Sequence, residues 1–289
     1  MNSTIAFSMS MLIFGTIGAL VRSIPLPAGE IALIRGFVGA LTLLPILRMT
    51  GRPFPWKTVT RHLPLIVIAG AALAGNWICL FEAFKRTSIA NATVSYYSAP
   101  VYLLLLSPIL FHERLTLRKI VCVILTFTGM SLIAFGTRGA GSGQSLPLGL
   151  LFGFSAAVFY ATLMILNRYL RDLSGLEATA LQLVIASAVL LPYVAFTGRI
   201  VMPEGGITLC LLAILGIVNT GLGFFLFFSG MRGLPASSIS VLSYLDPLTS
   251  VAISLVIFRE RMTPGQAFGA ALVLGSTLAA GIKFRERKA

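Results

Sequence analysis

The fold can be inferred from a segment near the carboxyl end of the chain and its earlier counterpart. Residues 243–263 read SYLDPLTSVAISLVIFRERMT, and residues 96–116 read YYSAPVYLLLLSPILFHERLT. An offset of 147 positions aligns Tyr97 with Tyr244, Pro100 with Pro247 and Glu113 with Glu260, and the same offset places residues 43–52 on 190–199. A constant offset over this length predicts two related halves, residues 1–140 and 147–289.

Composition indicates the environment of this fold. Of the 289 residues, 57% are apolar and 11% are charged, and the mean hydropathy is +0.94. A soluble domain carries about 25% charged residues and about 45 to 50% apolar ones, so the chain is predicted to be an integral membrane protein. Its net charge of +13 comes from basic residues between apolar runs, which is typical of membrane topology rather than of a nucleic-acid partner.

The chain contains enough long apolar runs for a polytopic bundle. A helix needs about 20 apolar residues to cross the hydrocarbon core of a bilayer. We therefore predict an all-α protein with ten transmembrane helices over residues 4–21, 29–47, 63–84, 89–111, 118–136, 147–168, 175–196, 207–229, 236–258 and 265–284. Each half holds five of them, and because five is odd, the second half is predicted to be inverted relative to the first.

The loops predict how the chain sits in the membrane. With the amino terminus in the cytoplasm, the inner segments hold twice as many Lys and Arg residues as the outer loops. The positive-inside rule then places both termini in the cytoplasm, in a plasma (inner) membrane. Inverted repeats are typical of secondary transporters, whose halves exchange inward-open and outward-open states.

Several motifs also resemble a known family. They are Ser243-Tyr244-Leu245-Asp246-Pro247, the segment Arg259-Glu260-Arg261-Met262-Thr263, their first-half counterparts in residues 87–100 and 112–116, and Ile34-Arg35-Gly36-Phe37. Over nearly its whole length the chain resembles EamA-type members of the drug/metabolite transporter superfamily. The resemblance implies a ten-helix metabolite exporter, with a cavity lined by helices 1, 3, 4, 6, 8 and 9 and a cargo of amino acids or related amino compounds. Ala99 departs from the pattern, since it lacks the acid that Asp246 supplies in the second half.

Asp246 is the strongest candidate for a binding residue. A carboxylate at the centre of a transmembrane helix costs about 2.5 to 3.5 kcal/mol on insertion scales, so such residues are usually functional. Ser243 lies on the same helix face as Asp246. Together with Tyr244, Tyr97 and Trp77, Asp246 favours a cargo that carries an amino group, and its protonation would couple transport to a proton gradient. The alternative is structural: a hydroxyl of a neighbouring helix, or Arg35, satisfies the carboxylate.

Two prolines at equivalent positions predict breaks in their helices. Pro100 and Pro247 lack a backbone donor and therefore free the carbonyls of Tyr96 and Ser243. Exposed polar backbone near the midplane is where repeat-built transporters bind cargo. Both prolines are predicted hinges, and the alternative to cargo binding at the freed backbone is a hinge or packing kink with no ligand contact.

Further polar and aromatic residues in predicted spans complete the candidate binding site. Tyr and Trp in the membrane need a partner for their polar atom, and steps of three and four residues place polar residues on one helix face. The additional candidates are Asn91, Ser95 and Ser98 on the fourth helix, Asn76 on the third and Asn219 on the eighth.

Four charged residues are predicted to form structural ion pairs. They are Arg35, Glu82, Glu113 and Glu260; for Arg35 the alternative is contact with a substrate carboxylate. Glu82 precedes Lys85 and Arg86 at the spacing that favours helical ion pairs. The small-residue sequence from Gly265 to Gly269 allows close helix approach and is predicted to pack against the fifth helix.

Other function classes fit the sequence less well. A membrane enzyme would need a nucleophile with a base or a phosphate-binding loop, and a channel would need rings of charge or carbonyls. The three cysteines lie in apolar runs without a histidine at ligand spacing, so neither a metal nor a cofactor is expected. The expected partners are a small-molecule metabolite and the lipid bilayer, with the protein as a monomer; a channel, receptor or scaffold remains the alternative function.

Overall fold

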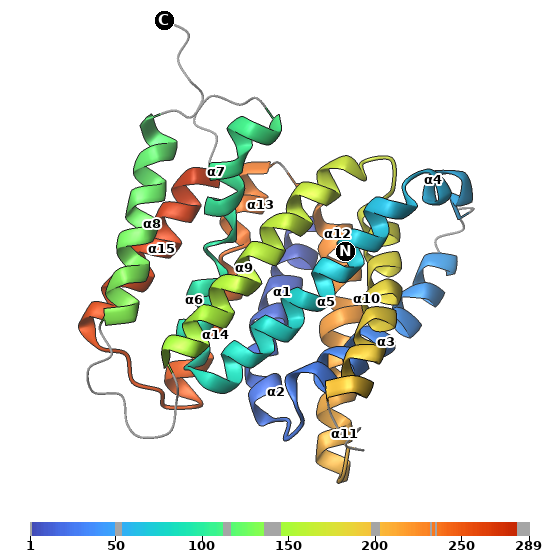
Figure 1. Ribbon diagram of the computed structural model, residues 1–289, viewed down its shortest axis with the longest axis horizontal. Helices are drawn as coiled ribbons and strands as arrows, with labels where there is room; N and C mark the ends of the chain where they lie inside the picture. The colour runs from blue at the N-terminus through green and yellow to red at the C-terminus, as the bar shows by residue number, and fades with distance from the viewer. Residues whose placement is uncertain are drawn as a thin grey trace, which may run out of the picture.

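The computed structural model describes residues 2–49, 54–111, 117–135, 146–197, 203–231, 233–234 and 236–281. These residues are helical almost throughout and contain no strand (Figure 1). Six helical stretches are long and apolar enough to cross a membrane: Ser3–Ser23, Ala28–Met49, Leu63–Arg86, Pro147–Tyr169, Gly175–Thr197 and Gly206–Met231. Ile120–Ile133 and Leu245–Val256 are shorter apolar helices. The chain is therefore an all-α, multi-pass membrane protein.

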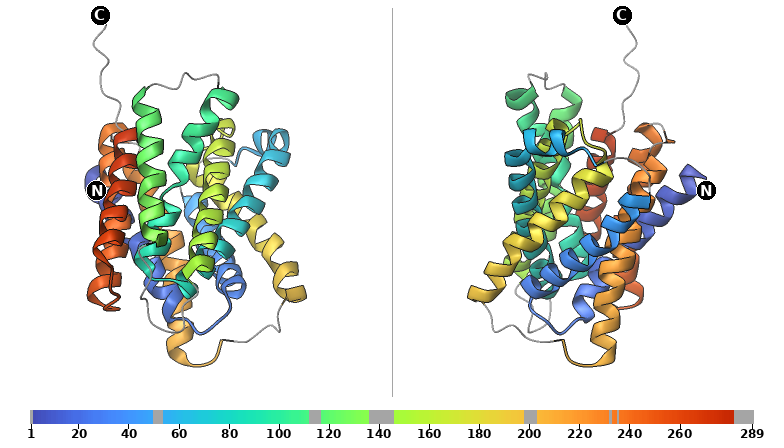
Figure 2. Two further views of the ribbon diagram at one scale, coloured as in Figure 1. Left: turned by 60° about the vertical axis from the view of Figure 1, so that its left-hand side comes forward. Right: turned by 90° about the vertical axis from the view of Figure 1, so that its right-hand side faces the viewer.

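The helices follow the predicted apolar runs, with several interruptions. The first half contains α1 (Ser3–Gly15), α2 (Ile17–Ser23), α3 (Ala28–Met49), α4 (Trp56–Arg61), α5 (Leu63–Arg86), α6 (Ile89–Tyr96), α7 (Ala99–Phe111) and α8 (Leu117–Phe135). The second half contains α9 (Leu146–Tyr169), α10 (Gly175–Thr197), α11 (Gly206–Ala213), the π-helix η1 (Ile214–Leu222), α12 (Gly223–Met231), α13 (Ala236–Leu242), α14 (Leu245–Val256) and α15 (Pro264–Gly281). Figure 2 shows the long helices running side by side, with the connections gathered at their ends.

Local sequence explains where several helices begin. Before α10, the Ser174 N–H donates to Glu177 Oε2 at 2.8 Å, and the Glu177 N–H donates to Ser174 Oγ at 3.3 Å. Thr263 and Gln266 form the same reciprocal pair before α15, at 2.9 and 3.3 Å. Such pairs satisfy the N–H groups that a helix start leaves without partners.

Helices α8 and α15 pack closely against each other at one side of the bundle (Figure 1). A Cβ atom added to Gly269 would lie 2.5 Å from the Gly129 carbonyl oxygen, closer than any real Cβ approaches an oxygen. The hydroxyls of Thr126 and Ser276 also hydrogen-bond across this pair at 2.6 Å. The predicted packing of the small-residue face of the last helix against the fifth predicted span is confirmed.

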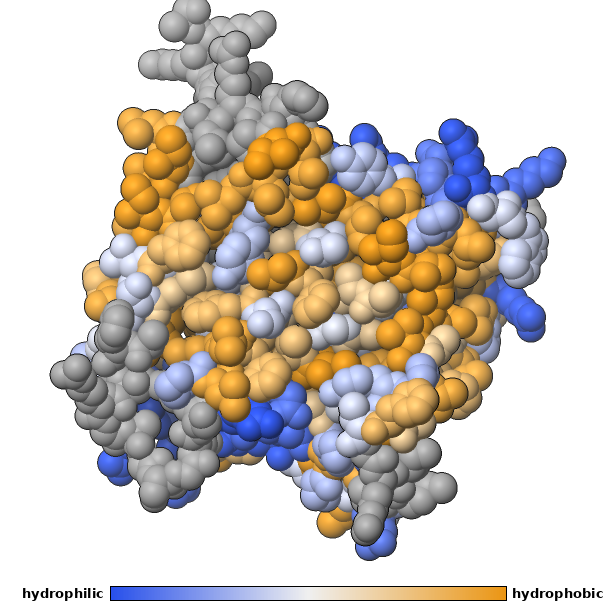
Figure 3. Space-filling model, viewed as in Figure 1, coloured by the Kyte–Doolittle hydropathy of each residue, from blue (hydrophilic) through white to orange (hydrophobic). Residues whose placement is uncertain are grey.

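The rest of the core forms around α3, α5, α9 and α10. Helix α5 lies against α9 and α10, and α3 lies against α10 and η1. Large apolar side chains also cover much of the outside, as with Phe196 at 90% exposure and Ile207 at 80%. Figure 3 shows one such apolar face, with hydrophilic residues gathered toward its edges, including the region of α4. An apolar exterior of this kind is suited to lipid.

Four of the predicted helices are irregular near their middles. The run 89–111 is interrupted between α6 and α7, and the run 236–258 is interrupted between α13 and α14. The first run breaks at Thr16, and the eighth contains η1. Backbone irregularity inside a membrane is tolerated only where protein or water satisfies the freed polar groups, so these positions mark where the interior is polar.

Candidate functional site

The breaks in two helices bring an acid and a tyrosine together. Asp246 lies in the first turn of α14, and Tyr97 lies in the break between α6 and α7. The Tyr97 hydroxyl donates a hydrogen bond of 2.6 Å to Asp246 Oδ2. The two residues belong to different halves of the chain and are 149 positions apart. A hydroxyl of a neighbouring helix therefore does partner the carboxylate, as the structural alternative required.

The end of α1 lies directly against this acid. The Ser250 hydroxyl donates to the Gly15 carbonyl oxygen at 2.9 Å. A Cβ atom on Gly15 would lie 2.7 Å from the carbonyl oxygen of Asp246. The α1 backbone can approach α14 this closely only because residue 15 has no side chain.

Asn219 ties η1 to the break between α1 and α2. Its Nδ2 donates to the Ile13 carbonyl oxygen at 2.6 Å and to Thr16 Oγ1 at 2.9 Å. Asn219 Oδ1 is buried without a hydrogen-bond partner. The amide group thus satisfies a carbonyl at the break, which is a structural contact rather than a free binding group.

Arg35 has a different environment from the expected ion pair. Its side chain is 3% exposed, its Nε donates to Thr220 Oγ1 at 2.9 Å, and no acid among the described residues forms an ion pair with it. The guanidinium lies 4.4 Å from the ring centre of Trp77 and 5.6 Å from that of Phe81. A guanidinium is weakly hydrated and stacks well on aromatic faces, so the rings cover its faces, while its Nη atoms have no hydrogen-bond partner among the described residues.

Two further tyrosines extend the site beyond the sequence prediction. The rings of Tyr96 and Tyr160 stack with centres 5.0 Å apart, and Tyr96 meets Tyr97 edge-on at 5.8 Å. Tyr160, on α9, is 36% exposed, and the charge of Asp246 acts on it. The rule that selected Tyr97 and Trp77, namely that a polar ring atom in a membrane needs a partner, could have selected both tyrosines. Thr220 carried no such signal.

Most of the other predicted binding residues use their polar groups within the fold. Ser95 Oγ donates to the Asn91 carbonyl oxygen at 2.8 Å, and Ser98 Oγ donates to that of Ser95 at 2.6 Å. Asn76 Nδ2 donates to the Ala156 carbonyl oxygen of α9 at 2.7 Å. The amide oxygen of Asn91 is buried without a hydrogen-bond partner. The Asn91 amide oxygen is therefore an acceptor that the described fold does not use.

Ser243 and Tyr244 occupy the break that precedes α14. The Ser243 hydroxyl donates to the Ile239 carbonyl oxygen at 2.7 Å, one turn back in α13. Tyr244 is half-buried and stands immediately before α14. Both residues are close to Asp246 along the chain, and Ser243 satisfies its hydroxyl locally.

The two prolines occupy equivalent positions in the broken helices. Pro100 is the second residue of α7, and Pro247 is the third residue of α14. Proline is well tolerated in the first turn of a helix, where its missing N–H would have no intrahelical partner. Each proline therefore begins a new helix segment after a break instead of bending a continuous helix.

A second group of charges lies at one end of the bundle. Arg22 Nη1 and Glu260 Oε1 form an ion pair of 2.6 Å, and Arg22 also donates to the Thr87 carbonyl oxygen at 2.8 Å. Glu260 Oε2 accepts a hydrogen bond of 2.9 Å from the Ile89 N–H, at the start of α6, and another from the Ser254 hydroxyl. We call these four residues, Arg22, Ile89, Ser254 and Glu260, the Arg22–Glu260 cluster. It connects both halves of the chain.

The remaining predicted ion pairs differ in outcome. Glu82 Oε2 pairs with Arg86 Nε at 2.7 Å, four residues on. Lys85 instead donates to the Leu26 carbonyl oxygen. Glu113 lies outside the residues that the structure describes.

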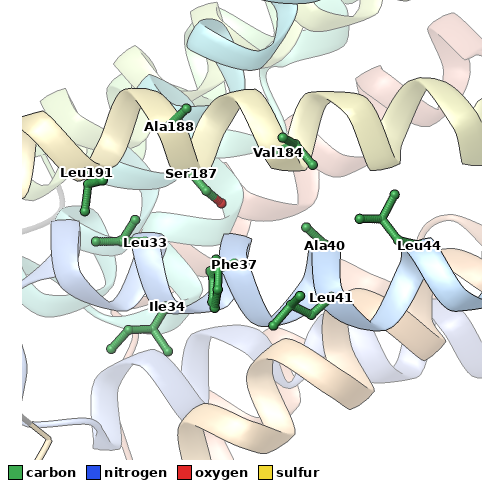
Figure 4. A pocket seen from close by; sticks show the side chains of 10 residues that line it. All are labelled: Leu33, Ile34, Phe37, Ala40, Leu41, Leu44, Val184, Ser187, Ala188 and Leu191. Carbon is green, nitrogen blue, oxygen red and sulfur yellow. The ribbon is translucent and has the colours of Figure 1, made fainter. Parts of the chain in front are cut away.

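A groove between α3 and α10 forms a separate feature, with a volume of about 570 Å³ (Figure 4). Its lining residues are Leu33, Ile34, Phe37, Ala40, Leu41, Leu44, Val184, Ser187, Ala188 and Leu191. The Ser187 hydroxyl donates to the Leu183 carbonyl oxygen of its own helix at 2.8 Å. The groove thus presents an almost entirely apolar surface and contains none of the predicted binding residues.

Comparison with known proteins supplies independent information on this arrangement. The model of the EamA-like transporter family matches residues 2–135 and again residues 147–281. An uncharacterized transporter, YxxF, of Bacillus subtilis (strain 168) is 29% identical over 94% of this chain and 87% of its own length. An uncharacterized transporter of Archaeoglobus fulgidus is 29% identical over 95% of this chain and 94% of its own.

A more distant relative and a solved structure agree with these matches. The protein RarD of Streptomyces exfoliatus is 25% identical over 74% of this chain and 65% of its own. One crystal structure is similar in fold, with a TM-score of 0.67, 22% identity, and coverage of 96% of this chain and 95% of that chain.

Proposed function

The chain belongs to the EamA-like transporter family, and we propose that it is a secondary transporter that exports amino acids or related amino compounds across the cytoplasmic membrane. The observation that carries this proposal is the Tyr97–Asp246 hydrogen bond of 2.6 Å, which joins the two halves at their helix breaks. An acid held inside a membrane bundle is typical of a substrate or ion pathway. A carboxylate beside tyrosine rings is suited to an amino group.

The proposed mechanism is alternating access by two inverted five-helix repeats, residues 1–140 and 147–289, which together span the membrane ten times. The helix contacts support this arrangement. Helix α5 packs on α9 and α10, and the segment related to it by 147 residues, η1 with α12, packs on α3 and α1. Each of these contacts thus has a counterpart between the related helices when the two halves are interchanged. A pair of repeats related by a two-fold axis requires such matching contacts.

The Arg22–Glu260 cluster is the proposed closure on the extracellular side. Positive-inside counting assigns the loops that hold Arg22 and Glu260 to that side. The ion pair of 2.6 Å and the capping bond to Ile89 join α2, α6 and the end of α14. Opening toward the outside then requires these contacts to separate, and the related Glu113 would act on the cytoplasmic side.

Transport in proteoliposomes tests the cargo class. Purified full-length protein is reconstituted in liposomes loaded with unlabelled amino acids, and uptake of each radiolabelled amino acid is followed. We expect counterflow of at least one amino acid, at rates well above those of protein-free liposomes. The proposed cargo class is wrong if neither amino acids nor amines exchange.

The same vesicles test coupling to protons, which we propose to occur at Asp246. Net transport is measured with and without an imposed pH gradient, at matched internal and external cargo concentrations. We expect the gradient to drive accumulation of the exchanged amino compound. Rates indifferent to the gradient would leave facilitated diffusion as the mechanism.

A further inference from the structure

Arg35 holds its guanidinium in place with only part of its hydrogen-bonding capacity. Nε is satisfied by Thr220 Oγ1 at 2.9 Å, and one face of the group is covered by Trp77 at 4.4 Å. Of the five N–H donors of an arginine, Nε carries one and the two Nη atoms carry the others. These contacts orient the fork of the guanidinium but leave its terminal N–H groups unused.

The terminal nitrogens of Arg35 belong to a side chain that is only 3% exposed. Within the described part of the chain, no residue accepts a hydrogen bond from either Nη atom. Neither Nη atom is fully shielded from solvent. A buried, permanent positive charge with unused donors needs a ligand or water to compensate it.

Asp246 presents a complementary group to the same interior. Its Oδ2 is bound by the Tyr97 hydroxyl at 2.6 Å, whereas none of the described residues donates to Oδ1, which is not fully shielded from solvent. The end of α1 connects Asp246 with Arg35: Asn219, next to Thr220, donates to Ile13 and Thr16, and Gly15 lies against the Asp246 carbonyl. The charges of Arg35 and Asp246 act on each other, although the two side chains form no direct ion pair. A positive and a negative group therefore face the interior without neutralising each other directly.

Resting on the proposed function, we infer that Arg35 is the anion-binding residue of the transport site. It binds the carboxylate of a zwitterionic cargo through its Nη atoms, while Asp246 and Tyr97 bind the amino group. An arginine fork matches both oxygens of a carboxylate, and Thr220 with Trp77 fixes the plane of that fork. The cargo is thus a molecule with both charges, and an amine alone leaves Arg35 uncompensated.

The two halves of the chain support a specific role for this pair. The residue related to Arg35 by the repeat is Gln182, whose Nε2 donates to Asn167 Oδ1 at 2.6 Å. The residue related to Asp246 is Ala99. At these related positions, each half therefore contributes one charge that the other half lacks. A single zwitterion then contacts both repeats.

Matched ligands test this inference on the wild-type protein. Thermal unfolding of the purified full chain is measured with each amino acid, with the amine formed by removing its carboxylate, and with its N-acetylated form. A ligand that binds the folded state raises the unfolding temperature. We expect an amino acid to stabilise the protein and its decarboxylated amine to bind about 10- to 100-fold more weakly, the value of a charge-assisted hydrogen-bonded pair.

Variants then assign the effect to Arg35. Arg35→Gln should abolish the preference for the amino acid over its amine. Arg35→Lys, which keeps the charge but loses the fork, should retain a reduced preference. Arg86→Gln is the control, because Arg86 is paired with Glu82 at 2.7 Å, and it should keep the wild-type preference.

The possible results separate the two proposals. If amines bind the wild-type protein as tightly as the amino acids, the cargo class stands but the role of Arg35 is wrong. If Arg35→Gln folds and weakens both ligands equally, Arg35 is structural. If neither class of ligand binds, the proposed cargo class is wrong, and so is the inference that rests on it. The wild-type ligand comparison decides the matter even if Arg35→Gln does not fold.

Discussion

At the scale of single residues, the site consists of few polar groups with unused capacity. Most hydroxyls in the described interior donate to a nearby backbone carbonyl: Ser95 does so within α6 at 2.8 Å, and Ser98, in the break after α6, does so to Ser95 at 2.6 Å. Such back-bonding satisfies the hydroxyl where water is scarce. Apart from the buried amide oxygens of Asn91 and Asn219, the groups left for a ligand are those on Asp246, Arg35 and the tyrosine rings. Substitutions there should affect transport more than substitutions of Ser95 and Ser98.

Replacement of Asp246 should therefore remove transport more than stability. Asp246→Asn keeps the shape of the side chain and can still accept from Tyr97, but it loses the charge that binds an amino group. We expect at least a 10-fold loss in transport of the cargo, the approximate value of a charge-assisted hydrogen bond. The measurement is counterflow in proteoliposomes.

The control for Asp246→Asn is Ser131→Ala, since Ser131 is exposed and donates only to the Phe127 carbonyl oxygen of its own helix at 2.9 Å. It should transport at the wild-type rate. An Asp246→Asn protein that binds and moves cargo as well as wild type would show that the acid is structural.

At the scale of elements, the contacts between helices depend on small residues at particular positions. Gly15 allows α1 to reach the backbone of Asp246, and Gly129 with Gly269 brings α8 and α15 together. A Cβ atom at these positions would overlap backbone atoms, which cannot move without separating the helices. Other glycines face open space, so the same substitution has opposite effects along one helix.

Helix α15 provides a matched pair of substitutions. Gly269→Ala places a Cβ atom 2.5 Å from the Gly129 carbonyl oxygen, and the overlap should cost about 1 to 3 kcal/mol. Gly275→Ala meets no atom within 4 Å and should be neutral or slightly stabilising, because alanine favours helix. Thermal unfolding of the two purified variants decides this, and equal unfolding temperatures would contradict the described packing.

The break between α6 and α7 should likewise respond to substitution. In Pro100→Ala a backbone N–H returns at position 100, which can bond to the Tyr96 carbonyl and extend the helix through Tyr97. A regular helix would rotate the Tyr97 ring away from Asp246, so we expect slower transport in proteoliposomes without a loss of folding. Leu103→Ala, on the same helix, is the control, and wild-type rates in Pro100→Ala would show that the break is not required.

At the scale of the whole molecule, the two halves contact each other through the Arg22–Glu260 cluster. Its ion pair and capping bonds hold α2, α6 and the end of α14 together at one end of the bundle. In an alternating-access transporter, contacts of this kind exist in one state and are absent in the other. Their strength therefore sets the balance between the two states.

Weakening this cluster should favour the state that is open on that side. Glu260→Gln removes the charge that pairs with Arg22 and weakens the cap on α6. In a protein whose three cysteines are replaced, Ala90→Cys, fully buried here, should react several-fold faster with a membrane-impermeant maleimide when Glu260→Gln is present. Glu82→Gln, which breaks the pair with Arg86 instead, is the control, and equal labelling in both would exclude a gating role.

The orientation of the bundle is a separate prediction at this scale. Most of the +13 net charge lies in segments assigned to the cytoplasm, and the positive-inside rule places both termini there. Green fluorescent protein fused to either terminus should fluoresce in intact cells, and alkaline phosphatase at the same positions should be inactive. The reverse pattern would invert the assignment of the Arg22–Glu260 cluster to the extracellular side.

Local chemistry in the sequence was enough to determine the class of fold and the polar positions within it. The apolar runs predict membrane helices, because a bilayer demands about 20 apolar residues and internally satisfied backbone groups. The interruptions at Pro100 and Pro247 follow from the missing donor of proline, and Asp246 is conspicuous because a charge is costly in hydrocarbon.

Only the tertiary structure decided which of those groups meet. Tyr97 reaches Asp246 across 149 residues, and Arg35 reaches Thr220 across 185, on helices whose rotation depends on the packing of their neighbours. The same packing directed the hydroxyls of Ser95 and Ser98 to nearby backbone carbonyls and gave Arg35 aromatic faces where an acid was expected. Hydrophobicity specifies that a segment crosses the membrane, but close contacts between side chains fix which of its faces points into the bundle.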